Sequence, residues 1–294
     1  MSSAMILSKR TWVLGSAALA VMLAGQAIAA PAFYAVTGNF PGPSQLVLMD
    51  VGAGTASTVN PILFGGGNTN FIQDADFDGS GNLIGVRQNP GAGFPPSPLN
   101  ILYQIDTTTA AATFLSSLSF NPARSLAYRP ANGQFYSVNQ NTGRLATLDV
   151  NTGLYTNVSA VGLGLGQFRI DALAFAPNGD LYGVYDAGSP FAGTIDSRLV
   201  RIDVVTGLAT MIGPIGALNT QNFTSLRFDP GSGIAYTVEM NLGTVNTVNL
   251  TTGLGTAVFT DSDLIGTTGL AFIPSPGAAA LLLLTGAFAA RRRR

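Results

Sequence analysis

Hydrophobic positions along the chain fall into short runs that are separated by turn-forming residues, and residues 172–216 show this pattern most clearly. The apolar runs 172–175 and 181–184 flank a Pro-Asn-Gly turn, and the runs 199–204 and 209–212 flank a Thr-Gly turn. Short apolar and β-branched runs bounded by Gly, Pro and Asn are typical of strands joined by hairpins. The segment therefore predicts a four-stranded sheet.

The same unit recurs along the chain. Its second strand begins at residues 33, 83, 135, 181 and 235, so successive copies lie 50, 52, 46 and 54 residues apart. A period near 50 residues with four strands per copy is the signature of a β-propeller. The third strand of each copy ends at a residue whose side chain is expected to cap a turn by accepting backbone hydrogen bonds. These residues are Asp50, Asp106, Asp149, Asp203 and Asn249.

The first strand of the unit decides how the ring closes. Its copies lie at residues 75–77, 126–128, 173–175, 226–228 and 270–272, so none precedes Phe33 and the last has no second strand after it. We expect residues 270–273 to pair beside residues 33–36, because this completes one blade from both chain ends and leaves no open edge at the seam. The predicted fold is all-β, a five-bladed β-propeller with four strands per blade, over residues 30–273.

Composition excludes several kinds of chemistry. The 294-residue chain has no Cys and no His, which removes disulfides, thiolate sites and the commonest general base and metal ligand. Its single Lys is Lys9, which leaves no lysine chemistry in the propeller. Residues 30–273 hold eight Arg against fifteen acidic residues, a net charge of −7. An acidic domain without Lys is poorly suited to a phosphate backbone, so we expect no nucleic-acid partner, and we expect a monomer.

Residues 1–29 have the layout of a secretory signal peptide. Lys9 and Arg10 precede a mostly apolar run over residues 11–25, and Ala27 and Ala29 fit the small-x-small cleavage pattern. We predict a helical signal peptide that signal peptidase removes after Ala29. The alternative is an uncleaved membrane anchor.

The C-terminal tail, residues 274–294, combines a short Pro motif, an uncharged stretch over residues 278–290 and a basic end. As a helix, this stretch of 13 residues spans roughly 20 Å, against about 30 Å for a bilayer core. It is short for a permanent anchor and indicates a transient sorting signal, with a weak anchor as the alternative. The motif and the basic end consist of Pro274, Ser275, Pro276, Gly277, Arg291, Arg292, Arg293 and Arg294.

This three-part layout resembles the PEP-CTERM sorting tail of Gram-negative bacteria. The resemblance covers residues 274–294, and Ser275 stands where the family typically has Glu. It implies processing by an exosortase, a membrane protease, with transient membrane contact through the chain termini. It also implies delivery to the cell surface or an exopolysaccharide matrix. The repeats are similar to secreted propeller domains with LYxID and TGxxT-type motifs, a resemblance that supplies no catalytic function.

One loop has the spacing of a metal site. Asp76, Asp78, Ser80 and Asn82 place oxygen ligands at positions 1, 3, 5 and 7 of an EF-hand-like loop, with Gly at position 6. Position 12, however, is Arg87 instead of the bidentate Glu of an EF-hand. A polar hairpin turn is the favoured interpretation, Ca²⁺ binding is the alternative, and no other cofactor is expected.

Three functional hypotheses remain. A non-catalytic binding protein would hold a glycan by stacking sugars on Phe94 and Phe191, although each ring could instead pack under its own loop. A glycosidase would need two carboxylates, for which Asp74, Asp76 and Asp171 are the candidates near the innermost strands. The low content of charged residues would suit an inert matrix component. We expect a non-catalytic binding or structural role, with the glycosidase as the alternative.

Overall fold

The structure, a computed structural model, describes residues 30–38, 42–65, 67–68, 71–87, 100–119, 124–158, 160–166, 169–188, 195–217 and 220–273. The chain divides into two compact units, Met1–Ala30 and Pro31–Arg294, and the fold described below belongs to the second. The predicted signal peptide, with Ala27 and Ala29, and the tail from Pro274 to Arg294 lie outside the described residues. Within the described ranges, no helix has the length and apolar character needed to cross a bilayer.

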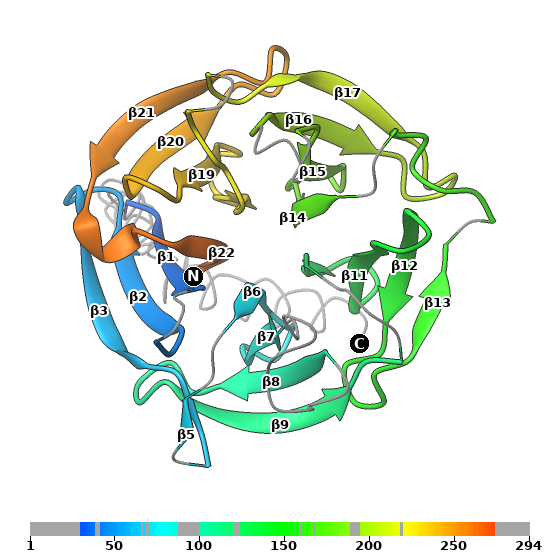
Figure 1. The fold of residues 1–294 in the computed structure, drawn as a ribbon. Coiled ribbons are helices and arrows are strands. Elements are labelled where there is room, and N and C mark those ends of the chain that lie inside the picture. Colours follow the sequence, from blue (N-terminus) through cyan, green and yellow to red (C-terminus); the bar gives the residue numbers. More distant parts are fainter. Residues whose placement is uncertain are drawn as a thin grey trace, which may run out of the picture. The chain divides into compact units, whose positions relative to one another are not determined.

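Five antiparallel sheets stand around a common axis, each with its first strand innermost and its fourth outermost (Figure 1). Blade one contains β22 (Thr267–Phe272), β1 (Ala32–Thr37), β2 (Gln45–Asp50) and β3 (Thr55–Pro61). Blade two contains β6 (Ile72–Phe77), β7 (Leu83–Arg87), β8 (Ile101–Ile105) and β9 (Ala111–Ser117). Blade three contains β10 (Ala127–Arg129), β11 (Gln134–Asn139), β12 (Arg144–Leu148) and β13 (Tyr155–Asn157). Blade four contains β14 (Ile170–Phe175), β15 (Leu181–Asp186), β16 (Ser197–Ile202) and β17 (Ala209–Pro214). Blade five contains β18 (Arg227–Phe228), β19 (Ala235–Glu239), β20 (Thr244–Val248) and β21 (Gly255–Thr260).

The seam closes as the repeat predicts. β22 pairs with β1 in antiparallel register, with Phe272 opposite Phe33 and Leu270 opposite Ala35. Blade one is therefore built from both ends of the propeller chain. The prediction of a five-bladed, all-β propeller with four strands per blade is confirmed.

The hydrophobic core is divided among the interfaces between blades. Each of the five apolar clusters draws its members from two neighbouring blades. The aromatic residue near the end of an innermost strand packs on a Tyr of the preceding blade, as Phe175 does on Tyr136 and Phe228 on Tyr182, with ring centroids 5.1 and 5.6 Å apart. Because a single sheet leaves one face uncovered, each blade depends on both neighbours for its stability.

Three innermost strands carry a β-bulge near their start. The register skips Gln73 in β6, Asp171 in β14 and Thr268 in β22. A bulge inserts one unpaired residue and changes the direction of the local side chains. These residues lie at the end of the ring where the innermost strands begin, which we call the mouth end; the opposite end, with the hairpin turns, is the turn end.

Three short elements lie outside the predicted four-stranded units. β4 (Leu63–Phe64) and β5 (Gly67–Asn68) form a hairpin between blades one and two. β4 pairs in parallel with β9 and so extends the outer edge of blade two. A 3₁₀ helix, η1 (Ser262–Leu264), precedes β22. The hairpin covers part of an edge strand that would otherwise present unpaired backbone groups to solvent.

The five predicted turn caps are present. For example, Asp203 Oδ1 accepts hydrogen bonds from the amides of Val205 and Thr206, and Asn249 Oδ1 accepts from those of Thr251 and Thr252. The hydrogen bonds from Thr206 and Val205 hold the pKa of Asp203 below its usual range. Asn249 fills the same position in blade five without a titrating group.

This difference predicts a change in acid stability. The depressed pKa means that Asp203 stabilises the folded state above its unfolded pKa of about 3.9, and that this contribution is lost as the pH falls through the folded pKa. Asp203→Asn should keep the cap and show a smaller loss of Tm between pH 7 and pH 3 than the wild type. The reciprocal variant Asn249→Asp should show a larger loss. Identical pH profiles for all three proteins in thermal unfolding would contradict this account.

Candidate functional site

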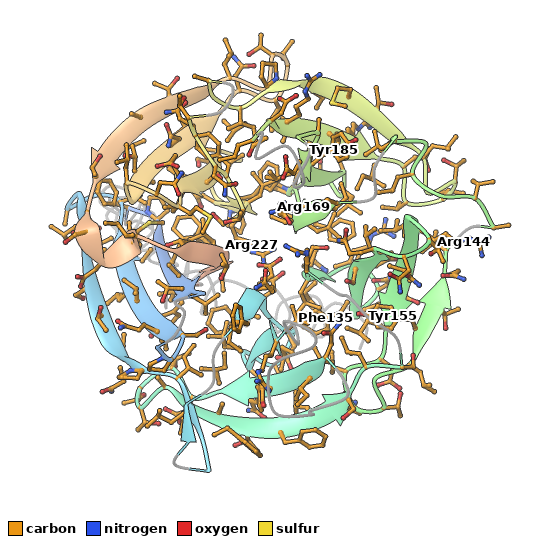
Figure 2. All side chains as sticks on the ribbon, viewed as in Figure 1. Phe135, Arg144, Tyr155, Arg169, Tyr185 and Arg227 are labelled. Atoms are coloured by element: carbon orange, nitrogen blue, oxygen red, sulfur yellow. The ribbon has the colours of Figure 1, made fainter. Side chains whose placement is uncertain are left out.

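One guanidinium group occupies the axis of the propeller. Arg227, in β18, is 4% exposed and lies near the centre of the ring (Figure 2). It donates hydrogen bonds to four backbone carbonyls, one from each of the other blades, and forms ion pairs with two carboxylates of blade two. The carbonyls belong to Ala75, Leu126, Leu173 and Leu270, and the carboxylates to Asp74 and Asp76, each 3.3 Å from a guanidinium nitrogen.

Comparison of the repeats explains why there is room for this side chain. Pairing with the second strand of each blade shows that Asp76, Ala127, Ala174, Arg227 and Ala271 occupy equivalent positions. Three of the five positions are alanine, and the other two have opposite charges. The sequence analysis above missed the Asp–Arg pair. Alignment of the five copies would have revealed it.

Asp74 and Asp76, two of the proposed catalytic carboxylates, are built into this axial structure. Asp74 is fully buried and accepts hydrogen bonds from the amides of Ala75 and Leu126, while Asp76 accepts from those of Phe77 and Tyr128. Burial raises the pKa of both carboxyl groups, although Arg227 and the amides act in the opposite direction. A raised pKa is a property of general acids, but Asp74 has no exposed surface with which to reach a substrate.

The third proposed carboxylate, Asp171, lies at the mouth end in a different environment. Its Oδ1 is 3.0 Å from Arg169 Nε and 3.5 Å from Arg124 Nη1. Arg169 also lies 2.8 Å from Asp186 Oδ2. Gln140 of blade three bonds to both the amide and the carbonyl of Ile170 and thereby fixes the start of β14. We call Arg124, Gln140, Arg169, Asp171 and Asp186 the axial mouth.

The axial mouth combines buried carboxylates with partly exposed cations. Asp171 is 4% exposed, whereas the side chains of Arg124 and Arg169 are 29% and 28% exposed. Burial opposes the charge on Arg169, but the pKa of Arg169 is raised because Asp171 and Asp186 lie beside it. The arrangement offers charged hydrogen-bond donors to a ligand while the carboxylates hold those donors in place. Sequence reasoning missed both arginines, since they lie in connections 45 residues apart.

In the loop considered as an alternative calcium site, the two aspartates have different partners. Asp76 points towards Tyr128 and Arg227, as described above, while Asp78 accepts hydrogen bonds from the amides of Ser80 and Asn82 and from the Asn82 side chain. The described residues contain no group of three acidic side chains placed to hold a metal ion. The loop has the bonding of a polar hairpin turn, the favoured interpretation, and Ca²⁺ binding stays the untested alternative.

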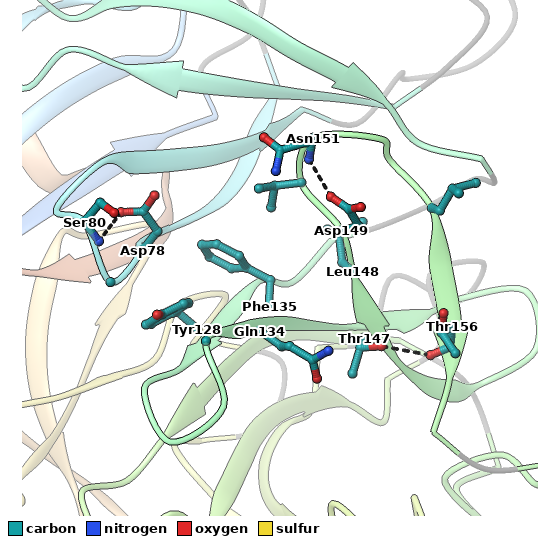
Figure 3. A pocket seen from close by; sticks show the side chains of 14 residues that line it. Asp78, Ser80, Tyr128, Gln134, Phe135, Thr147, Leu148, Asp149, Asn151 and Thr156 are labelled. Atoms are coloured by element: carbon teal, nitrogen blue, oxygen red, sulfur yellow. Dashed lines mark hydrogen bonds between the residues drawn. The ribbon is translucent and has the colours of Figure 1, made fainter.

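A groove of about 740 Å³ lies at the turn end between blades two and three (Figure 3). Of its two aromatic residues, Phe135 is 3% exposed and Tyr128 is half-buried. Its two carboxylates, Asp78 and Asp149, cap their own turns. The groove is therefore a weaker candidate for a binding site than the axial mouth.

The proposed stacking residues Phe94 and Phe191 lie outside the described residues. The strands that flank them end at the mouth end: β7 at Arg87 and β15 at Asp186. A third aromatic residue, Phe223, is 1% exposed and belongs to the core between blades four and five. Phe223 is thus a packing residue, which was the alternative considered for aromatic residues of this kind.

Comparisons with known proteins support the fold alone. No protein-family model matches the chain, and no curated protein of similar sequence was found. A chain in the crystal structure of a nidogen–laminin complex aligns with a TM-score of 0.51 and 10% identity, over 83% of this chain and 98% of that chain. TolB from Acinetobacter baumannii aligns with a TM-score of 0.47 and 16% identity, over 84% and 57% of the two chains. A 6-phosphogluconolactonase-like protein from Bacteroides fragilis aligns with a TM-score of 0.47 and 10% identity, over 85% and 99%.

The axial ion pairs give a prediction for stability. Arg227→Met should lower the free energy of unfolding by about 3–5 kcal/mol, because it leaves two buried carboxylates without a cation. The triple variant Arg227→Met/Asp74→Asn/Asp76→Asn keeps acceptors for the amides of Leu126 and Tyr128 and has no unpaired charge. It should recover a large part of the loss in chemical denaturation. A triple variant as unstable as the single variant would show that the unpaired carboxylates are not the cause of the lost stability.

Proposed function

We propose that this protein is an exported, surface- or matrix-sorted propeller that binds a polar ligand, such as a glycan, at the axial mouth without chemically changing it. The observation that carries the proposal is the state of its carboxylates. Asp171 is engaged by Arg124 and Arg169, and Asp74 and Asp76 by Arg227. Glycoside hydrolysis needs one carboxyl group that can donate a proton and a second at a defined distance across the bond. Carboxylates paired with arginines suit a binding role better.

The position of the mouth also supports ligand binding. Bulges in three innermost strands direct polar residues to this end of the ring. The long connections 88–99 and 189–194 join strands whose ends lie there. Ligand sites are commonly formed by loops that a rigid scaffold holds in position. At the turn end, by contrast, the polar groups of the groove satisfy the backbone of their own hairpins.

A glycan array tests binding at the mouth. The wild-type protein should retain at least one glycan, and Arg124→Gln/Asp171→Asn should weaken that binding by roughly tenfold, because charged hydrogen bonds are removed. The control Arg201→Gln/Asp180→Asn removes an exposed Arg–Asp pair at the turn end and leaves the net charge equally unchanged. It should bind like the wild type.

The outcome also separates binding from catalysis. Retained glycans should be recovered intact by mass spectrometry after prolonged incubation. Cleavage by the wild type that disappears in the variant at the mouth would favour the glycosidase alternative. Equal loss of binding in both double variants would argue against a site at the mouth.

Export and sorting form the second part of the proposal and rest on the sequence of residues 1–29 and 274–294. In a host with an exosortase, the full chain should reach the cell surface with both termini removed. A chain that lacks residues 274–294 should be exported but not sorted. The measurements are cell fractionation and the intact mass of the protein. The same mass and location for the two chains would count against a sorting tail.

A further inference from the structure

The closing strand β22 ends close to the axis, at the turn end of the ring. By register with the second strand, Phe272 is equivalent to Phe175 and Phe228, which are followed in blades four and five by the hairpin turns of that end. The carbonyl of Leu270, two residues before the end of β22, accepts a hydrogen bond from Arg227 near the centre of the ring (Figure 2). The chain therefore leaves the propeller at the centre of its turn end.

Backbone pairing fixes this exit point. β22 pairs with β1 as far as Phe272, and the amide of Ile273 donates a hydrogen bond of 2.9 Å to the carbonyl of Ala32. Ala32 is the first residue of β1, so both strands of the seam reach the turn end together. Residue 273 cannot move to another part of the ring unless the pairing of blade one is broken.

A short tether joins the exit point to the apolar stretch of the tail. Residues 274–277 separate Ile273 from the stretch 278–290. The five residue steps from Ile273 to Ala278 span at most about 18 Å when the chain is fully extended. While residues 278–290 contact a bilayer, as the sequence predicts, Ile273 must lie within this distance of the stretch.

The dimensions of the ring then decide which end faces the lipid. A route from the innermost to the outermost strand of a blade crosses three strand spacings, about 14 Å in all. A six-residue strand such as β22 adds about 20 Å along the height of the ring. Arg227 fills the centre, so the tether would have to run around the rim to bring the mouth end to the bilayer. That path of about 34 Å is nearly twice the reach of the tether.

We infer that the propeller, while its tail is held in a membrane, stands with its turn end towards the lipid and its axial mouth away from it. This inference rests on the membrane contact that is part of the proposed function. The long connections 88–99 and 189–194 join strands that end at the mouth, so they lie on the outward side as well. A glycan outside the membrane can then reach the mouth before the tail has been processed.

Single cysteine labels measure the orientation, because the chain has no cysteine of its own. Val205→Cys places a label at the turn end and Leu242→Cys places one at the mouth end, where the two side chains are 78% and 60% exposed. The exported chain, isolated from a host without an exosortase so that it keeps its tail, is bound to vesicles of phosphatidylcholine and phosphatidylglycerol with an acceptor dye on the headgroups. Energy transfer should place the label at position 205 closer to the lipid than the label at position 242, by about 17–20 Å, the length of a strand.

A longer tether provides the matched control. Insertion of about twenty Gly and Ser residues between Ile273 and Pro274 extends the reach to about 80 Å and changes no residue of the ring. The ring can then turn freely, so the two labels should lie at equal mean distances from the lipid. A chain that lacks residues 274–294 should not bind the vesicles.

The results separate the orientation from the membrane contact itself. Equal distances with the native tether, or a shorter distance at position 242, would overturn the inference and leave the membrane contact standing. If the exported chain does not bind the vesicles, both are lost. Binding without residues 274–294 would show that another surface holds the ring and would also overturn the inference. Should Val205→Cys fail to fold, as judged by its thermal unfolding, Leu154→Cys labels the same end at a side chain that is 59% exposed.

Discussion

The structure depends on a single buried cation at the point where all five blades meet. The innermost strands of a propeller have one edge without a strand partner, so their carbonyl groups need donors from elsewhere. Arg227 provides those donors to four blades and is itself part of the fifth. Its charge is compensated by Asp74 and Asp76. A polar group of this kind is stable in the interior only when every one of its partners is present.

The buried guanidinium of Arg227 requires small residues around it. The equivalent positions in three other blades are alanines, and Gly269 lies so close to Asp74 that an added Cβ would come within 2.6 Å of the Asp74 Cα. Arg227 contacts the carbonyl of Leu173, two residues further along β14 than Asp171. The axial cation therefore lies below the mouth, and the mouth is a shallow site above a filled centre.

Much of the architecture could be predicted from the sequence because it depends on local patterns. The turns, the alternation of apolar runs and the seam between residues 33–36 and 270–273 all follow from the repeat. The bulges at Asp171 and Thr268 could not be predicted, because a shift of register by one residue does not change the pattern of an apolar run. Because the bulge at Asp171 was not predicted, the contact of Asp171 with Arg124 and Arg169 could not be predicted either. The hairpin of β4 and β5 was missed because its Gly-rich sequence is typical of a loop.

The seam also has a consequence for the order in which the protein can be made. β1 is among the first propeller segments to be synthesised, yet its inner neighbour β22 is the last. During translation, β1, β2 and β3 can form a three-stranded sheet, but the position of β22 stays vacant. The ring thus stays open until residue 272 has left the ribosome, however long the earlier blades have had to form. Blade one is therefore the last blade to be completed, although three of its four strands are synthesised first.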